Sequence, residues 1–290
     1  MSFLIVGASG MVGNAFMSEL GKRGIPYFGT YCTRQKQGLV QLDITDRAAT
    51  VRLLAKLNPD VLVQTAAQPN VDYCEDHREE AWQTNVVGTE NVVYACRPLG
   101  VKHVIISTDY VFDGNAGPYG EDDPVNPINY YAITKVESER TVRSLSDYLI
   151  IRTGVVFDAD LDSKNFALRV VNDLSARKVL KVPTDQIGNP TLASNLASCT
   201  IELALNDRVG IYNVAGQTIM PRSDLAYLVC RKFQLDDQLI QPVLSEELHQ
   251  RAKRPKKLGL KTEKASKELL TQLLTADAAV DIFHGRLKQI

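Results

Sequence analysis

The sequence predicts an α/β protein with a doubly wound parallel sheet and a smaller C-terminal lobe. In the first half of the 290 residues, short apolar runs alternate with stretches of helical periodicity. This alternation is typical of βαβ units. The runs are mostly apolar throughout, as expected of parallel strands that helices cover on both faces. The predicted strands are residues 3–6, 27–31, 39–42, 61–64, 104–107 and 149–152.

A glycine-rich turn follows the first predicted strand. Gly7, Gly10 and Gly13 separate the run 3–6 from a helical stretch over 14–22. Glycine lets the backbone approach a pyrophosphate, and the N–H groups and dipole at the start of the helix favour its negative charge. The spacing is G-x-x-G-x-x-G, whereas the usual fingerprint is G-x-G-x-x-G, and a plain tight turn is the alternative. In this βα context we expect a dinucleotide, bound as in a Rossmann fold.

The end of the second predicted strand bears on the choice of dinucleotide. An acid there would accept the ribose 2′-OH of NAD, whereas a basic residue suits a 2′-phosphate. No acid occurs between Glu19 and Asp43, and Thr33, Arg34 and Lys36 follow the strand. We therefore expect NADP(H) in preference to NAD(H), with Arg34 bound to the phosphate. The alternative is an arginine that is solvated on a loop.

The run 104–107 breaks into polar residues at its carboxyl end, where Ser107, Thr108 and Asp109 follow one another. Neighbouring side chains of a strand point to opposite faces, so Ser107 and Thr108 cannot both face the same site. One hydroxyl is expected to polarise a substrate carbonyl while the other packs. The residues themselves do not decide which one, and a polar strand end that leads into a loop is the alternative.

Tyr131 and Lys135 are four residues apart on a predicted helix that Asn129 can cap. This spacing places the phenol and the ammonium on one face, whereas Tyr130 has Thr134 four residues on. A positive charge about 5 Å away, at an effective dielectric of about 20, is worth roughly 3 kcal/mol. The pKa of Tyr131 is therefore expected to fall from about 10 to about 8. A surface tyrosine with a solvated lysine is the alternative.

After about residue 155 the pattern changes to helical stretches that are separated by short apolar pieces and prolines. The predicted helices are residues 166–178, 192–205, 222–233 and 262–273. We expect a dinucleotide-binding domain over 1–155 and a substrate-binding lobe over 156–290. No Gly/Ser-rich linker marks the boundary, so the chain can cross back to the sheet.

Composition narrows the classes of partner. The net charge is −1, which gives no electrostatic support for nucleic-acid binding. The five cysteines are scattered, with no C-x-x-C, and no charged-then-apolar leader opens the chain, so we expect a cytoplasmic protein with no disulfides and no membrane partner. The four histidines lie far apart, and no metal site is expected. Nothing in the sequence decides the oligomeric state, and a homodimer remains open.

Together these motifs resemble those of the extended short-chain dehydrogenase/reductases, and within them the dTDP-4-dehydrorhamnose reductase family. The resemblance covers nearly the whole chain. Its more specific strings are S-T-D-Y-V-F at 107–112 and D-Q-x-G-x-P-T at 185–191. Beyond the glycine turn and the Y-x-x-x-K pair, it also includes Asp43, residues 65–67, Asn85 and residues 254–255.

The resemblance implies roles for individual residues. Tyr131 would be the proton donor, Lys135 would lower its pKa and hold the nicotinamide ribose, and Thr108 would polarise the carbonyl in preference to Ser107. The implied dinucleotide-binding residues are Gly7, Ser9, Gly10, Met11, Val12, Arg34, Asp43, Ile44, Thr65, Ala66, Ala67, Tyr131 and Lys135. The implied substrate-side residues are Thr108, Asp109, Tyr110, Asn165, Phe166 and Arg254, of which Arg254 could equally be a surface charge in the basic run 251–257.

The function implied is transfer of a hydride from NADPH to the 4-keto group of a nucleotide-activated deoxysugar. In the rhamnose-forming enzymes a tryptophan stands where this chain has Val155. The sugar would lose a stacking surface there, which is compatible with a different deoxysugar. Residues 109–114 with Pro118 and Tyr119 also resemble the beta subunit of methionine adenosyltransferase, a non-catalytic NADP-binding regulatory subunit. A third interpretation is a sugar-nucleotide epimerase or dehydratase on the same fold, in which Asp109 could be an additional acid–base group.

Overall fold

A computed structural model describes residues 1–289 and contains one central sheet of seven parallel strands, in the order β11-β6-β5-β4-β1-β2-β3. The strands are β1 (Phe3–Val6), β2 (Tyr27–Tyr31), β3 (Val40–Gln41), β4 (Val61–Gln64), β5 (Lys102–Thr108), β6 (Tyr148–Thr153) and β11 (Gly210–Asn213). The predicted doubly wound sheet is confirmed. The strand order reverses between β1 and β4, and a crevice forms at the carboxyl ends of the strands at such a point.

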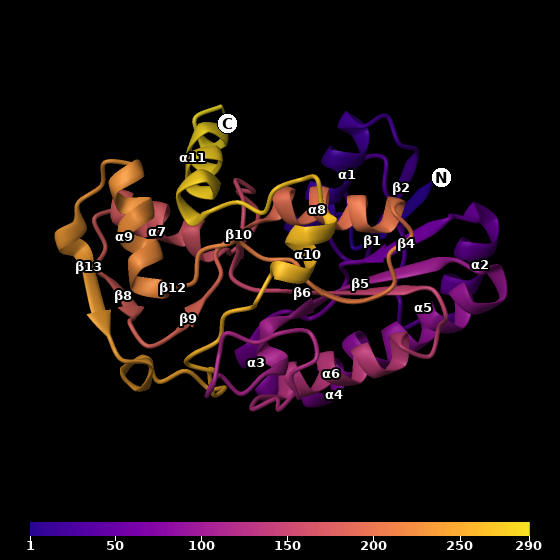
Figure 1. Ribbon diagram of the computed structural model, residues 1–290, viewed down its shortest axis with the longest axis horizontal. Helices are drawn as coiled ribbons and strands as arrows, with labels where there is room; N and C mark the ends of the chain where they lie inside the picture. The colour runs from indigo at the N-terminus through magenta and orange to yellow at the C-terminus, as the bar shows by residue number, and fades with distance from the viewer. Residues whose placement is uncertain (290) are drawn as a thin grey trace.

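Helices cover both faces of the sheet, with α1 and α8 above the strands and α5 and α6 below them in Figure 1. The alternation along β1 shows why its residues are all apolar. Phe3 and Ile5 pack in the layer of α1 and α8, and Leu4 and Val6 pack in the layer of α2 and α5. The upper layer holds α1 (Met11–Lys22), α8 (Ala193–Leu205) and α10 (Glu263–Glu268). On the other side lie α2 (Arg47–Leu57), α3 (Val71–Asp76), α4 (Arg78–Trp82), α5 (Gly88–Cys96) and α6 (Tyr130–Val142). The short helices η1 (Gln83–Val87) and η2 (Arg97–Leu99) pack against α5.

A second lobe, at the left of Figure 1, has its own apolar core beside the carboxyl ends of the sheet. Phe157, Leu168, Leu225, Val229 and Phe283 are among the buried residues of this core. Its helices are α7 (Phe166–Ser175), α9 (Arg222–Lys232), η4 (Asp237–Leu239), η5 (Ser245–Leu248) and α11 (Ala276–Leu287). Its strand pairs are β7 (Val156–Phe157) with β10 (Thr191–Leu192), β8 (Leu180–Pro183) with β13 (Ile240–Val243), and β9 (Ile187–Gly188) with β12 (Met220–Pro221). The short helix η3 (Asp109–Val111) follows β5.

The chain returns to the sheet after its first excursion into the second lobe. Leu196, Ile201 and Leu203 of α8 are fully buried in the core that they share with β1 and α1. The strand β11 then pairs with β6 at the edge of the sheet. The two lobes are therefore connected by several chain crossings, and α8 belongs in space with the first 155 residues.

The strands over 3–6, 27–31 and 61–64 occur as predicted, residue for residue. The helix predicted over 262–273 is wrong in its second half, because α10 ends at Glu268. The carboxylate of Glu202 on α8 accepts the N–H groups of Leu270 and Thr271, which replaces the hydrogen bonds of a continued helix. In residues 1–289, no helix is both long and apolar enough to cross a membrane.

Candidate functional site

A cavity of about 1310 Å³ opens at the carboxyl ends of the central strands, between the sheet and the second lobe. The glycine turn, the end of β5, the start of α6 and the start of α7 all contribute to its wall. Of the residues that the sequence assigns to the dinucleotide and the substrate, all but Arg34 and Arg254 line it. The fold therefore brings together segments that are more than 150 positions apart, such as Gly7 and Phe166.

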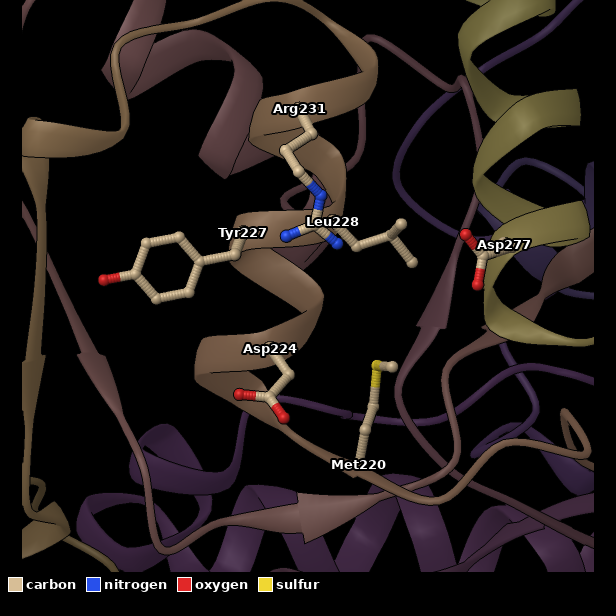
Figure 2. A pocket seen from close by; sticks show the side chains of 6 residues that line it. All are labelled: Met220, Asp224, Tyr227, Leu228, Arg231 and Asp277. Carbon is tan, nitrogen blue, oxygen red and sulfur yellow. The ribbon is translucent and has the colours of Figure 1, made fainter.

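A smaller hollow of about 330 Å³ lies on the second lobe and shares no lining residue with this cavity. Figure 2 shows Asp224, Tyr227 and Arg231 on α9 and Asp277 on α11 around it. None of the residues that line this hollow belongs to the predicted site. The large cavity is therefore the candidate functional site.

The turn after β1 has the geometry of a phosphate cradle. Gly7 has a φ of +91°, and a Cβ atom on it would lie 2.6 Å from the backbone nitrogen of Ala66. A Cβ atom on Gly13 would lie 2.3 Å from the carbonyl oxygen of Gly7, so α1 can approach the turn only without that atom. The N-cap of α1 is Gly10, and no side chain bonds to the N–H groups of the first helical turn. These groups are left for a ligand, and the turn fits a pyrophosphate.

Arg34 lies beside this turn but does not line the cavity, whereas Cys32 and Thr33 do. Its Nη2 donates a hydrogen bond to the carbonyl oxygen of Ser9, and its Nη1 lies 3.3 Å from Oδ2 of Asp162 in the second lobe. The guanidinium is thus next to the predicted phosphate site. It would have to leave Asp162 to turn toward a 2′-phosphate.

The two hydroxyls at the end of β5 have different surroundings. Ser107 Oγ donates to Oε1 of the buried Glu139 at 2.6 Å, and Arg152 Nη2 donates to Oε2 of the same carboxylate at 2.8 Å. The hydroxyl of Thr108 accepts the N–H of Tyr110 at 3.2 Å, and its proximity to Tyr131 opposes the rise in the pKa of that phenol. Both residues touch the cavity, but the Ser107 hydroxyl is held by an interior carboxylate.

Tyr131 and Lys135 lie in the first turns of α6, which Asn129 caps as expected by accepting the N–H of Ala132 at 2.9 Å. The ammonium of Lys135 donates to the carbonyl oxygen of Ile106 on β5 at 2.9 Å, and burial lowers its pKa to about 8. Burial raises the pKa of Tyr131, which corrects the predicted fall. The phenolate is poorly solvated in this cavity, and the loss of hydration outweighs the effect expected of a nearby positive charge.

Asp109 is a buried acid in the wall of the cavity. Its Oδ1 accepts a hydrogen bond from Thr108 Oγ1 at 3.2 Å. A Cβ atom on Gly154 would lie 2.4 Å from its Oδ2, so the carboxyl group occupies space that only a glycine leaves free. Burial raises the pKa of Asp109 to about 6, and the positive charge of Arg222 opposes that rise.

Two arginines differ from the sequence-based expectation. Arg254 is neither a surface charge nor a cavity residue, because its side chain is only 9% exposed and its Nη2 lies 3.0 Å from Oδ2 of Asp72. Arg222 was not predicted, yet it lines the cavity. The pairing of β12 with β9 brings it there, and this contact has no local signal in the sequence.

The sheet order, the glycine turn and the Tyr131–Lys135 pair define an NAD(P)-dependent oxidoreductase of the short-chain dehydrogenase/reductase class. The family model described as "RmlD substrate binding domain" matches residues 1–287. The chain therefore belongs to this family, the dTDP-4-dehydrorhamnose reductase-like branch of the extended short-chain dehydrogenase/reductases.

Three known proteins illustrate the range of the family. A probable low-salt glycan biosynthesis reductase of Haloferax volcanii is 31% identical over 93% of this chain and 92% of its own. The dTDP-4-dehydrorhamnose reductase of Bacillus anthracis, solved in complex with NADP, has a TM-score of 0.89 at 25% identity and covers 98% of this chain and 99% of its own. Methionine adenosyltransferase 2 subunit beta of Xenopus tropicalis is 29% identical over 84% of this chain and 75% of its own.

Proposed function

We propose that the protein reduces the 4-keto group of a nucleotide-activated deoxysugar with NADPH. The observation that carries this proposal is the convergence of Tyr131, Thr108 and Lys135 on the cavity into which the phosphate turn opens. Similarity to a dTDP-4-dehydrorhamnose reductase over almost the full chain supports the same substrate class. We place the reaction in the cytoplasm, in keeping with five cysteines that form no disulfide.

The wall of the cavity fits a nicotinamide dinucleotide, which supplies the hydride when it is bound. The N–H groups of Met11 and Val12 would bind its pyrophosphate at the start of α1. Asp43, Ile44 and residues 65–67 also line the cavity. Asp43 and Ile44 would lie beside the adenine, and residues 65–67 would line the path of the dinucleotide toward β5. Lys135 would hold the nicotinamide ribose through its ammonium group. This ammonium already donates to the carbonyl oxygen of Ile106, so its position is fixed by β5.

The chain's own part in the chemistry is to move one proton. As the ketone carbon accepts a hydride, negative charge develops on its oxygen, and the Tyr131 hydroxyl gives its proton to that oxygen. A raised pKa keeps this phenol protonated at neutral pH, which is the state a donor requires. Thr108 would donate a hydrogen bond to the same oxygen, so that its charge is stabilised before the proton arrives.

The Tyr131→Phe substitution tests this assignment. It removes the transferable proton while it keeps the ring, so we expect kcat to fall about 10² to 10⁴-fold with little change in NADPH affinity. Single-turnover oxidation of NADPH with a panel of nucleotide 4-ketosugars measures the rate. Tyr130→Phe is the matched control, because the Tyr130 ring packs under the guanidinium of Arg78. A Tyr131→Phe protein as active as its parent contradicts the mechanism.

The preference for NADPH rests on Arg34. Replacing Arg34 with alanine is expected to weaken NADPH binding at least about tenfold and NADH binding little, because only NADPH carries the 2′-phosphate. Titration of both coenzymes by fluorescence measures the two affinities. Equal effects on NADPH and NADH remove the assignment.

Val155 is the reason to test several sugars. It lines the cavity and has a φ of +47°, a conformation that a β-branched residue rarely adopts. It stands where the rhamnose-forming enzymes have a tryptophan, so we propose a deoxysugar other than the rhamnose precursor. Epimerase or dehydratase activity, with Asp109 as an additional acid–base group, would begin with transfer of a hydride from the C4 alcohol of a nucleotide sugar to the oxidised coenzyme. It would therefore be tested with NAD(P)⁺ and nucleotide sugars that carry a 4-hydroxyl group, as conversion of the sugar without net coenzyme consumption.

A regulatory subunit is the second candidate function. The similarity to a methionine adenosyltransferase subunit beta favours it, and retention of Tyr131 and Lys135 does not oppose it. Tight NADPH binding without turnover on any sugar of the panel would support this alternative over the reductase.

A further inference from the structure

Four cationic side chains line the cavity, and their charges are not equally available. Lys135 donates to the carbonyl oxygen of Ile106, and Arg169 pairs with Asp173 at 3.2 Å. Within residues 1–289, neither Lys164 nor Arg222 has an ion pair with a carboxylate. The charge of neither residue is neutralised by an ion pair, and Arg222 is the one whose position is fixed by stacking on an aromatic ring.

The guanidinium of Arg222 is held over an aromatic ring. Its central carbon lies 5.1 Å from the centroid of the Phe166 ring at the start of α7. Its backbone N–H donates to the carbonyl oxygen of Gln186 at 2.9 Å, which anchors the start of α9. Stacking on a ring orients a guanidinium but leaves its N–H groups free at the edge, where they match the oxygens of a phosphate.

Arg222 lies on the substrate side of the cavity rather than at the glycine turn. Burial raises the pKa of Tyr110, and the neighbouring Arg222 guanidinium opposes that rise. The Tyr110 ring lies edge-on to that of Tyr131, with 6.4 Å between the ring centroids. The cation is therefore one aromatic side chain away from the proton donor. A hexose whose 4-keto group faces Tyr131 would extend its anomeric phosphate away from that residue.

We propose that Arg222 binds the diphosphate of the nucleotide-activated substrate. This inference rests on the proposed function, because it takes a nucleotide sugar as the ligand. A structural role as the counter-ion of Asp109 is the alternative, because the charge of Arg222 opposes the rise in the pKa of that carboxyl group. No ion pair joins the two residues within 4.0 Å, however, so the guanidinium is not held by the carboxylate. Asp109 instead accepts a hydrogen bond from Thr108.

The test measures binding without turnover. The protein is saturated with NADPH, so that added nucleotide cannot occupy the coenzyme's own phosphate site, and dTDP and thymidine are titrated by calorimetry. Arg222→Met keeps an apolar chain over Phe166 but removes the charge. We expect it to weaken dTDP about tenfold to a hundredfold, to leave thymidine unchanged, and to leave NADPH affinity unchanged. Arg222→Lys is expected to recover part of the loss.

Two further variants make the result specific. Arg231→Met removes a positive charge from the same helix but outside the cavity, and it should bind dTDP like the parent protein. Arg169→Met removes a charge inside the cavity that Asp173 already pairs with. An equal loss in Arg169→Met and Arg222→Met would overturn the proposal, since the whole cavity and not Arg222 would then hold the anion.

Different experimental results would disprove the role of Arg222 and the proposed reductase reaction. If the parent protein with NADPH bound does not bind dTDP, UDP or GDP, the inference about Arg222 is wrong, whatever carbonyl the protein reduces. If dTDP binds and depends on Arg222 while no 4-ketosugar is reduced, the diphosphate site stands and the reductase assignment falls.

Discussion

The ionisation of Asp109 shows how strongly the cavity acts on a single residue. The carboxyl group is 3% exposed, and burial raises its pKa to about 6 although Arg222 and Thr108 both favour its charged form. In the unfolded chain an aspartate titrates near 3.9. Above pH 6 both states are ionised and the folded state carries the cost of desolvation. As the pH falls through 6 toward 4, the folded state takes up its proton first and that cost disappears.

Replacing Asp109 with asparagine should therefore make the protein more stable at neutral pH. The amide is uncharged, so we expect the free energy of unfolding to rise by about 3 kcal/mol at pH 7.5 and the gain to vanish near pH 4. Urea unfolding at several pH values measures it. The exposed Asp122→Asn control should change the free energy by less than about 0.5 kcal/mol. A gain that does not depend on pH would show that the Asp109 charge is not its source.

Ser107 and Thr108 show the limit of sequence reasoning at this scale. Alternation along a strand predicts that the two hydroxyls face different surroundings, which the contacts of Ser107 with Glu139 and of Thr108 with Asp109 bear out. The sequence does not say which of them meets a carboxylate from α6. That depends on the packing of α6 against β5, which the spacing of residues along the chain does not encode.

At the scale of elements, the position of α1 depends on a close contact between its backbone and the turn after β1, which leaves no room for a side chain. Gly13→Ala would put a Cβ atom 2.3 Å from the carbonyl oxygen of Gly7 and 2.7 Å from the Cα of Ala8. Because backbone must move to relieve this overlap, we expect a loss of about 1–3 kcal/mol in the free energy of unfolding. We also expect weaker NADPH binding, since the phosphate turn itself is displaced.

Gly21→Ala is the matched control on the same helix. There the nearest atom to an added Cβ is the Tyr27 hydroxyl at 3.7 Å, so alanine fits and raises helix propensity by about 1 kcal/mol. Chemical denaturation and NADPH titration of both variants measure the difference. If Gly13→Ala proved as stable as Gly21→Ala, the close approach of α1 to the turn would not be the reason for the glycine.

The residues of α6 predict where this helix starts, but they do not predict the direction in which the pKa of Tyr131 shifts. The Asn129 cap and the four-residue spacing of Tyr131 and Lys135 depend on neighbours in the chain, so the helix starts where expected. The pKa of Tyr131 depends on which other elements exclude water from the phenol. Burial in the cavity therefore reversed the direction that a simple charge–charge estimate predicted.

At the scale of the whole molecule, the first 155 residues do not complete their own core. The face of the sheet that carries Phe3 and Ile5 is covered partly by α8, whose residues Leu196, Ile201 and Leu203 are fully buried. A fragment of residues 1–155 would expose this apolar face to water.

We therefore expect the 1–155 fragment to lack a cooperative unfolding transition, whereas the full chain should unfold cooperatively. Circular dichroism during urea titration of both proteins makes the comparison. A fragment ending at residue 213 would retain α8 and β11 and is expected to bury that face again. Cooperative unfolding of the 1–155 fragment would instead mean that the dinucleotide-binding segment folds by itself.

The sequence by itself determined the local features. The apolar runs gave β1, β2 and β4 to the residue, the glycines predicted the tight turn after β1, and the spacing of Tyr131 and Lys135 placed both on one helix. These features depend on residues that are close in the chain, so their patterns can be recognised without a structure.

The tertiary structure alone decided the features that arise from distant contacts. It brought Arg222 beside Phe166, returned α8 and β11 to the sheet, and ended α10 at Glu268 where Glu202 takes the next N–H groups. It also set the direction of the pKa shift of Tyr131. The physical reason is common to all of these: burial and charge neighbourhood are properties of the space around a side chain, which is filled by segments far away in the sequence.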